Sequence, residues 1–222
     1  MQPTLIHLHG LGSSPLSDKA VVLGERLRRC GVTYLVPDLA VPSFERLTLT
    51  AVIGRVAELA AATPGRLALV GSSFGGLAAL HFVHRHNQGA AARVERLALL
   101  APALDLLGDA DRRRERGELD DDWLDRWQRD GYLDLPHSAS GEDRPVHYGL
   151  AEDLRGYDSF SIDLELPTLI YHGRRDESVP YRQSARFAAD RPNVELRLLD
   201  SDHRLADKLD RIGDGIIDFM GV

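Results

Sequence analysis

The chain has 222 residues, of which 43% are hydrophobic, and this is enough apolar material for one globular domain with a sizeable core. Its formal net charge of −7 argues against nucleic acid and against stable association with an anionic membrane. The one cysteine, Cys30, excludes an internal disulfide bond, and with no signal-peptide pattern and no long apolar run we expect a soluble, cytoplasmic protein.

Strands and helices are expected to alternate along most of the chain, because short Val-, Leu- and Ile-rich runs alternate with amphipathic segments. In chain order the expected elements are strand 4–10, helix 17–31, strand 32–38, helix 47–62, strand 66–71, helix 73–87, strand 94–103, strand 166–173, helix 181–190, strand 194–200 and helix 204–220. The strands lack polar alternation, which indicates burial on both faces and parallel pairing. The pattern therefore predicts an α/β fold with a mainly parallel, doubly wound sheet of about six strands.

Residues 104–163 interrupt this alternation. They begin with a charged run at 109–123, continue with the aromatic residues Trp123, Trp127 and Tyr132, and end in a stretch rich in proline, glycine and serine. This stretch is too long for a simple connection. We expect a single domain over residues 1–222, with a helical cap inserted at about 104–163. The charged run is expected to be a solvated helix face.

The pentapeptide at residues 71–75, Gly-Ser-Ser-Phe-Gly, lies between an expected strand and an expected helix. This is the context of the G-x-S-x-G turn, in which a strained strand-to-helix elbow exposes a nucleophilic serine. Very small residues are needed two positions before and two positions after that serine, and Gly71 and Gly75 occupy these positions around Ser73. Ser73 is therefore the candidate nucleophile, and its neighbour Ser72 is not.

A serine hydroxyl needs a base to take its proton, and the usual base is a histidine oriented by a carboxylate. In this architecture the order along the chain is serine, acid, histidine. Asp176 follows the strand at 166–173, and His203 follows the strand at 194–200. Asp200 and Asp202, which flank His203, are alternative acids. His81, His84 and His86 are expected to pack or to lie at the surface, and contact with the substrate is the alternative for His137 and His147 in the cap. His172 is expected to pack at the strand end or to support one of the site residues.

The loop after the first strand, His9-Gly10-Leu11-Gly12, is a candidate for oxyanion binding. In this sheet architecture one donor is the backbone N–H after the nucleophile, here that of Phe74. The other donor comes from this early loop, here the N–H of Leu11. A phosphate-binding interpretation is weaker, because the sequence lacks the glycine patterns of nucleotide-binding loops. Neither a cofactor nor a metal ion is expected.

On these motifs the chain resembles serine hydrolases of the α/β-hydrolase fold. The opening LHGLGSSPLSDKA is similar to that of the YqiA-like small bacterial esterases, and VGSSFGG, IYHGRRDESVP and SDHRL are also similar to small acyl-protein thioesterases. The resemblance implies a three-layer fold that starts at what would be the third strand of the usual eight. It also implies Ser73, Asp176 and His203 as nucleophile, acid and base, with Leu11 and Phe74 as oxyanion donors.

The expected activity is cleavage of small-molecule carboxylic esters or thioesters with short-to-medium acyl groups, through an acyl-enzyme. Trp123, Trp127 and Tyr132 are candidates for an acyl-binding lid, and the alternative is that they pack the cap against the body. Two other functions remain open on the same fold: an acyltransferase that uses the same triad, and a ligand-binding module with weak catalysis.

Overall fold

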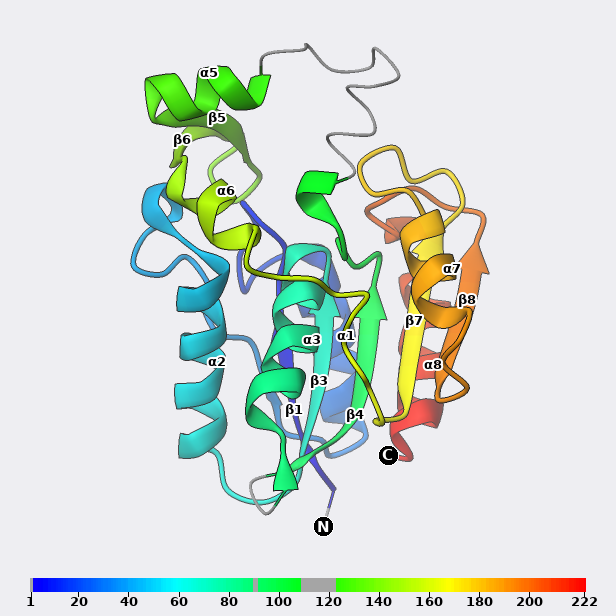
Figure 1. The fold of residues 1–222 in the computed structure, drawn as a ribbon. Helices are drawn as coiled ribbons and strands as arrows, with labels where there is room; N and C mark the ends of the chain where they lie inside the picture. The colour runs from blue at the N-terminus through cyan, green and yellow to red at the C-terminus, as the bar shows by residue number, and fades with distance from the viewer. Residues whose placement is uncertain (1, 90–91, 109–122) are drawn as a thin grey trace.

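The computed structural model of the chain describes residues 2–89, 92–108 and 123–222, and Figure 1 shows its fold. The main sheet has six strands, and all neighbouring pairs are parallel. From one edge to the other the strands are β2 (Tyr34–Leu35), β1 (Thr4–Leu8), β3 (Leu67–Ser72), β4 (Val94–Leu100), β7 (Thr168–Gly173) and β8 (Val194–Leu199). The parallel six-stranded sheet that the sequence predicts is confirmed.

The order of the strands places a switch point between β1 and β3. The chain leaves β1 toward β2 on one side and returns to β3 on the other side of β1. Leu8 at the end of β1 is in register with Gly71, and Ser72 at the end of β3 is in register with Leu100. Open α/β sheets bind ligands outside the carboxyl ends of their strands at such a point. The loops after β1 and β3 are therefore where a site is expected.

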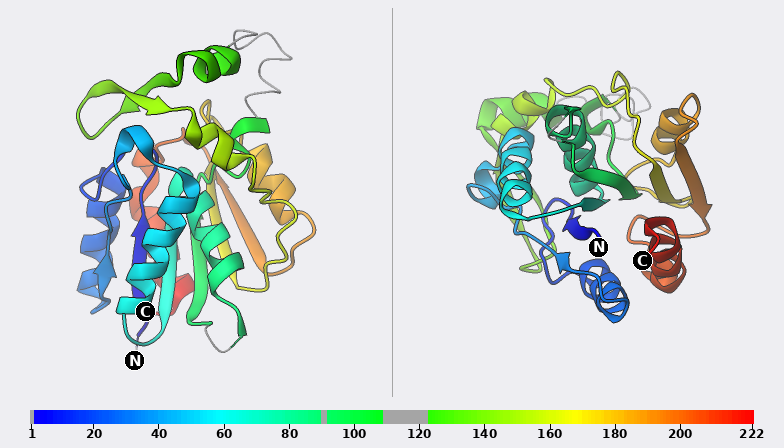
Figure 2. Two further views of the ribbon diagram at one scale, coloured as in Figure 1. Left: turned by 60° about the vertical axis from the view of Figure 1, so that its left-hand side comes forward. Right: turned by 90° about the horizontal axis from the view of Figure 1, so that it is seen from below.

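Helices cover both faces of the sheet and give a three-layer structure, which the view from below in Figure 2 shows. The helices α1 (Asp18–Arg29) and α8 (Leu209–Met220) lie together on one face, whereas α2 (Leu49–Ala62), α3 (Phe74–His86) and α7 (Arg182–Ala188) cover the other. The buried residues of α1 include Ala20, Leu23 and Leu27, a spacing of three and four that places them on one stripe. Among the described residues, no helix has both the length and the apolar character needed to cross a bilayer.

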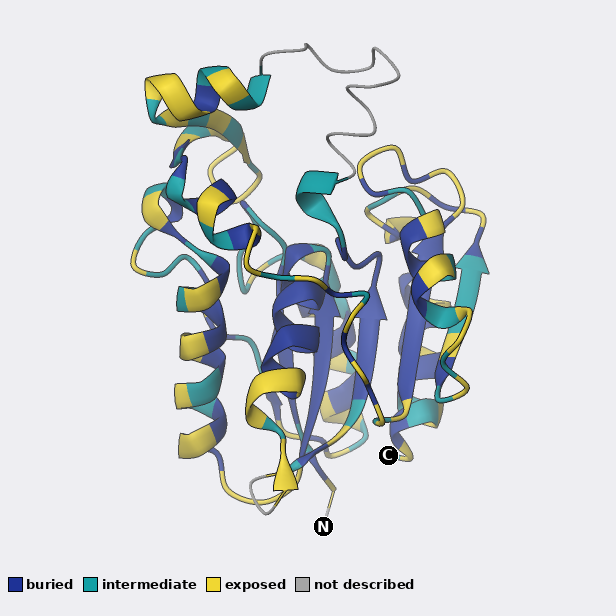
Figure 3. Ribbon diagram, viewed as in Figure 1, coloured by how far each residue is buried: buried dark blue, intermediate teal, exposed yellow. Residues whose placement is uncertain are grey.

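The central strands of the sheet are buried on both faces, as Figure 3 shows, whereas the edge strand β8 is mostly half-buried. All six residues of β3 and all six of β7 are buried. Polar alternation is absent from these runs because neither face of the sheet meets water. Each fully buried leucine or valine contributes roughly 1.5–3 kcal/mol, so the two apolar cores beside the sheet hold the strand ends in place.

Two elements fall short of their expected bounds by more residues than the others do. The last helix begins at Leu209 instead of residue 204 and follows a short 3-10 turn, η3 (Ala206–Lys208). Leu205 has φ +56, a left-handed conformation that does not continue an α-helix. At the other edge, β2 covers only two residues of the expected strand 32–38. It pairs with β1 alone, and Pro37 has no N–H to extend the ladder.

The insertion lies over the carboxyl ends of the strands, at the top of Figure 1. Its described part contains α5 (Trp123–Asp130), an antiparallel hairpin of β5 (Tyr132–His137) and β6 (Glu142–His147), and α6 (Gly149–Leu154). Leu119, an expected cap residue, and most of the charged run at 109–123 lie outside the described residues.

The hairpin differs from the expected helical cap with loop-like ends. Pro136 and Pro145 are typical of loops, and the sequence therefore predicted a loop here. Each strand of a two-stranded sheet is an edge strand, however, and proline is tolerated in edge strands. The strand β5 alternates exposed and partly buried residues, with Leu133 and Leu135 on the partly buried side. Gly141, with φ +78, ends the turn between the strands. This alternation is the signal that could have revealed the hairpin.

Candidate active site

Ser73 lies at the sharp turn between β3 and α3, with φ +53 and ψ −118. Positive φ in a residue other than glycine is strained and persists only where the surroundings hold it. The N–H of Ser73 donates to the carbonyl of Leu100 (2.9 Å), and its carbonyl accepts from the N–H of Ala103 (3.2 Å). The segment that follows the neighbouring strand β4 therefore helps to fix the turn.

The two glycines of the pentapeptide lie where no side chain fits. A Cβ on Gly71 would lie 2.6 Å from the carbonyl oxygen of Gly75 and 2.6 Å from Cα of Gly76. A Cβ on Gly75 would collide with the carbonyl oxygens of Leu8 and His9. Small residues are thus required because α3 begins in direct contact with β3 and with the end of β1.

Hydrogen bonds join Ser73, His203 and Asp176 in a chain. The Ser73 hydroxyl lies 3.1 Å from His203 Nε2, and His203 Nδ1 lies 2.7 Å from Asp176 Oδ2. An ionised carboxylate only accepts, so Nδ1 carries the proton and Nε2 of the neutral ring accepts from the hydroxyl. The three residues follow β3, β7 and β8, so distant segments of the chain meet at one edge of the sheet.

The Asp176 carboxylate is shielded from solvent and has several partners. Its Oδ1 accepts from the N–H groups of Ser178 (2.9 Å) and Val179 (2.7 Å), and its Oδ2 accepts from His172 (3.1 Å) as well as from His203. Burial by itself would raise the pKa of Asp176, but hydrogen bonds from His172, His203 and Val179 outweigh it and hold the pKa below its usual range. Asp176 is therefore ionised at neutral pH.

His172 is a fully buried partner of the carboxylate. Its Nε2 lies within hydrogen-bond distance of two acceptors, Asp176 Oδ2 (3.1 Å) and the carbonyl of Val179 (2.9 Å), so Nε2 carries the proton. Its Nδ1 then accepts from the hydroxyl of Ser184 (2.7 Å) in α7. His172 therefore supports the carboxylate, which is one of the roles expected from the sequence, and ties Asp176 to α7.

The two acids that flank His203 have other partners. Asp200 pairs with Arg175 (2.9 Å). Asp202 Oδ1 accepts from the N–H groups of Arg204 (2.9 Å) and Leu205 (3.1 Å), an interaction within its own turn. Of the three candidate acids, Asp176 is the one that hydrogen-bonds the imidazole.

The other histidines described as packing candidates make local contacts. His81 in α3 is buried and lies 3.1 Å from the hydroxyl of Ser159. In the hairpin, His137 Nδ1 lies 2.8 Å from the hydroxyl of Ser140. Among the described residues, no group of three or more His, Cys, Asp or Glu side chains is arranged to hold a metal ion.

The loop after β1 runs against Ser73. A Cβ on Gly10 would lie 3.4 Å from Ser73 Cβ and 4.0 Å from its hydroxyl oxygen. His9 holds the loop in place, because its Nδ1 donates to the carbonyl of Gly10 (3.0 Å) and its Nε2 accepts from the N–H of Leu39 (3.2 Å). Burial lowers the pKa of His9, which keeps the ring in the neutral form that these two bonds require.

Leu11 and Phe74, the two expected oxyanion donors, both line a small cavity of about 10 Å³ beside this loop. A space of this size admits about one water-sized atom. Gly10 and Gly12 also line it. The two backbone segments that carry the expected donors therefore lie on one small cavity.

The hairpin of the insertion contacts the same loop, and no pattern in the sequence predicted this contact. The hydroxyl of Ser138 (2.9 Å) and the N–H of Ala139 (3.2 Å) both donate to the carbonyl of Gly12. Gly12 has φ +66, and a Cβ there would collide with the carbonyl oxygen of Pro136. Only glycine lets the hairpin approach this closely, so the insertion bears directly on the loop that carries Leu11.

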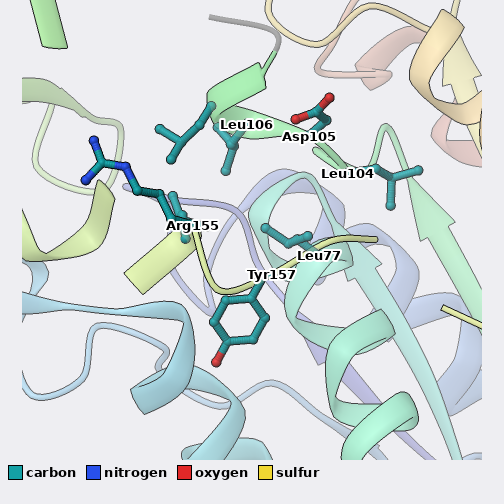
Figure 4. Close-up of a pocket in the computed structure, with 8 residues that line it drawn as sticks. Leu77, Leu104, Asp105, Leu106, Arg155 and Tyr157 are labelled. Carbon is teal, nitrogen blue, oxygen red and sulfur yellow. The ribbon is translucent and has the colours of Figure 1, made fainter. Parts of the chain in front are cut away.

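A larger cavity of about 210 Å³ lies between α3, the segment after β4 and the end of α6 (Figure 4). Its lining is mixed in polarity: Asp105 and Arg155 are charged, and the other lining residues are Leu77, Leu104, Leu106, Leu107, Leu154 and Tyr157. Leu77 lies one turn after Ser73 on α3, and Ala103, which donates to the Ser73 carbonyl, directly precedes Leu104. The cavity thus begins next to the elbow. The three leucines at positions 104, 106 and 107, which follow β4, are the sequence signal that could have revealed it.

The three aromatic residues expected to form a lid contact other parts of the protein. Trp123 and Trp127 share α5, with ring centroids 6.1 Å apart. Trp127 is buried and donates from Nε1 to the carbonyl of Val146 (2.8 Å). The hydroxyl of Tyr132 accepts from Arg46 (3.1 Å). Packing within the insertion accounts for Trp127, and the larger cavity is lined by the leucines described above.

The sequence model of the uncharacterised protein family UPF0227 matches residues 4–221 of the chain. No curated protein matches it. Among solved structures, "Putative hydrolase from Agrobacterium vitis S4" has a TM-score of 0.83 at 26% identity, and the match covers 99% of this chain and 88% of that one.

Two further structures have the same fold at lower identity. Alpha/beta hydrolase domain-containing protein 10 from mouse has a TM-score of 0.79 at 22% identity, covering 100% of this chain and 90% of that one. Est1E from Butyrivibrio proteoclasticus with bound ferulic acid has a TM-score of 0.80 at 22% identity, covering 98% and 88%. Together with the sheet and its flanking helices, these matches show the α/β-hydrolase fold.

Proposed function

We propose that this chain, which belongs to the uncharacterised protein family UPF0227, is a serine hydrolase that cleaves carboxylic esters or thioesters of short-to-medium acyl groups. The observation that carries the proposal is the hydrogen-bonded chain from the Ser73 hydroxyl through His203 to Asp176. A hydroxyl with a histidine acceptor, itself held by an ionised carboxylate, is the arrangement that makes serine nucleophilic at neutral pH.

In the first step, Ser73 Oγ attacks the carbonyl carbon of the substrate while its proton moves to His203 Nε2. The bond from carbon to the alcohol or thiol then breaks, and His203 returns the proton to that leaving group. Asp176 stays ionised and stabilises the imidazolium through the bond to Nδ1. The products of this step are the free alcohol or thiol and an acyl group on Ser73.

In the second step, water takes the place of the leaving group. His203 removes a proton from the water as its oxygen attacks the acyl carbon, and the proton then passes to Ser73 Oγ as the ester bond to the enzyme breaks. The acid is released, and the hydroxyl and the neutral imidazole are restored.

Both steps pass through a tetrahedral oxyanion, and the N–H groups of Leu11 and Phe74 are the proposed donors to it. Their residues border the same cavity of about 10 Å³ beside the loop after β1, which supports this assignment. Each such donor typically contributes about 3 kcal/mol to the transition state. The strained φ of Ser73 keeps the N–H of Phe74 at the start of α3, where the helix dipole also favours negative charge.

The larger cavity supports an apolar acyl group of limited length. Its volume of about 210 Å³ is below the range of roughly 300–1,000 Å³ that is usual for drug-sized ligands. Its leucine lining favours methylene groups, each worth about 0.8 kcal/mol when buried. We expect kcat/KM for p-nitrophenyl esters to rise about fourfold for each methylene beyond acetate until the cavity is full, and then to fall.

The direct test is turnover of this ester series by the wild-type protein, by Ser73→Ala and by Ser72→Ala. Ser73→Ala should lose turnover by roughly 10⁴-fold or more, whereas Ser72→Ala, which keeps the nucleophile and loses only the hydroxyl that accepts from Lys19, should lose at most about tenfold. Turnover that survives in Ser73→Ala would contradict the proposal. Transfer of the acyl group to an added alcohol in preference to water would instead identify an acyltransferase.

A further inference from the structure

Lys19 is a charged residue next to the active site that the proposed chemistry does not use. It lies in the first turn of α1, directly after the loop that carries Leu11. Its Nζ donates to the hydroxyl of Ser72 (2.9 Å) and to the backbone carbonyl of His203 (3.4 Å). One ammonium group therefore contacts Ser72, which precedes Ser73, and the backbone of His203, which accepts from the Ser73 hydroxyl.

The surroundings of Lys19 are unusual for a lysine. Burial lowers its pKa to about 8, although the carboxylates of Asp176 and Asp202 favour the charged form; Arg204 disfavours it. His7 in β1 also interacts with Lys19, and the pKa of His7 is lowered to about 3 by burial and by this neighbouring charge, so His7 adds no positive charge at neutral pH. These are the charged and titratable groups that face the ammonium from β1, the β7 loop and the His203 loop.

The loop that carries His203 has few other links to the elbow. Asp202 closes a turn within the loop, and Ser201 hydrogen-bonds Asp207, which lies in η3 just beyond it. Arg204 pairs with Asp18 on α1 (3.3 Å), but both side chains are about three-quarters exposed, at 74% and 73%, and such a pair contributes little. The contact from Lys19 joins the loop to the elbow itself.

We propose that Lys19 is a positioning residue that, in its charged form, clamps the backbone of His203 to Ser72 and so sets the distance between His203 and Ser73. The inference rests on the proposed hydrolase function. Lys19 does not touch the reacting atoms. Its effect is on placement, and a misplacement of about 1 Å at a reacting pair can reduce a rate roughly 100-fold.

The clamp makes activity sensitive to alkaline pH in a way that stability is not. As pH rises through about 8, Lys19 loses its proton and the charge-assisted bonds weaken, so kcat should fall while KM is unchanged. The effect of pH on the folding stability has the opposite sign. Between about 8 and the ordinary lysine value near 10.5, the unfolded chain binds the extra proton and the folded chain does not, so the contribution of Lys19 to stability rises with pH.

The experiment compares pH profiles of kcat and KM from pH 6.5 to 9.5 for four proteins: wild type, Lys19→Met, Lys19→Arg and Lys208→Met. Lys208 is the other lysine of the chain and pairs with Asp207 at the surface (2.9 Å), so its variant is the matched control. Thermal unfolding of each protein over the same pH range separates loss of activity from loss of fold.

For wild type and Lys208→Met we expect kcat to decline near pH 8 without a matching loss of stability. Lys19→Met should have kcat about tenfold lower at pH 7, KM within twofold, and no decline near pH 8. Lys19→Arg, whose charge does not titrate in this range, should recover at least a third of the wild-type kcat and also lack the decline. A Lys19→Met protein with wild-type kcat, or with the alkaline decline intact, would overturn the inference.

Three outcomes have to be interpreted separately. If Lys19→Met does not fold, the Lys19→Arg variant tests the clamp instead. A decline of kcat near pH 8 that persists in Lys19→Arg would contradict the clamp. If wild type itself turns over no ester or thioester, the hydrolase proposal fails first. If wild type is active and the Lys19 variants match it at every pH, only the clamp is wrong.

Discussion

The sheet edge and the insertion both lie at the carboxyl ends of the strands but differ in their chemistry. At the sheet edge, polar atoms are held in fixed pairs, as in the chain from Ser73 to Asp176, and each loop has a backbone hydrogen bond or a glycine that fixes its path. On the side of the insertion, the larger cavity is walled by leucines, and the hairpin reaches the loop at Gly12. Under the proposed function, this difference assigns bond cleavage to the sheet edge and selection of the acyl group to the insertion region.

The largest effect is expected at the sheet edge. Asp176→Asn removes the negative charge that stabilises the imidazolium, and it favours the wrong tautomer of His203. We expect kcat to fall by roughly 10⁴-fold with little change in KM. Asp202→Asn is the matched control, because Asp202 is next to His203 in sequence but accepts hydrogen bonds within its own turn. The amide oxygen of the introduced asparagine can accept the same bonds. Equal losses in the two variants would mean that Asp176 has no special role.

The contact between the two regions gives an intermediate effect. Gly12→Ala places a methyl group against the carbonyl of Pro136 and should push the hairpin and the oxyanion loop apart. We expect kcat to fall about tenfold, equivalent to roughly 1.4 kcal/mol. Gly141→Ala is the control: it has a similar positive φ, +78, but nothing within 4 Å, so it should lower stability by about 1 kcal/mol and leave kcat unchanged. If the two alanine variants had similar kinetics, the contact between the hairpin and the loop after β1 would have no effect on catalysis.

The smallest effect is expected in the larger cavity. Leu106→Phe should reduce the space for the acyl chain, so that the preference for longer esters over acetate shrinks severalfold while kcat for acetate is kept. Leu16→Phe, at a side chain that is 83% exposed, is the control and should not alter the preference. An unchanged chain-length series in Leu106→Phe would show that the acyl group binds elsewhere.

The sheet edge was also more predictable from sequence than the insertion, for a physical reason. Parallel strands buried on both faces leave continuous apolar runs, so the strands ending near Ser73, Asp176 and His203 could be placed within a few residues. The glycines at 71 and 75 follow from crowding that any such elbow has. Ser73, Asp176 and His203 then had to emerge at one edge, and hydrogen bonds join them there.

The insertion lacks such constraints. Its hairpin contains Pro136 and Pro145, which read locally as a loop, and its Trp pair at four-residue spacing fits either a lid or internal packing. The contacts of Lys19 could not be read from sequence either. A lysine in the first turn of a helix normally faces solvent, and its partners at Ser72 and His203 lie 53 and 184 residues away along the chain.

The most direct test of the central claim is covalent labelling of the wild-type protein with a fluorophosphonate probe, followed by mass mapping of the modified residue. We predict one label, on Ser73, formed rapidly at neutral pH in wild type and Ser72→Ala and absent from His203→Ala and Ser73→Ala. A wild-type protein that stays unlabelled, or that is labelled at another residue, would contradict the assignment of Ser73 as the nucleophile.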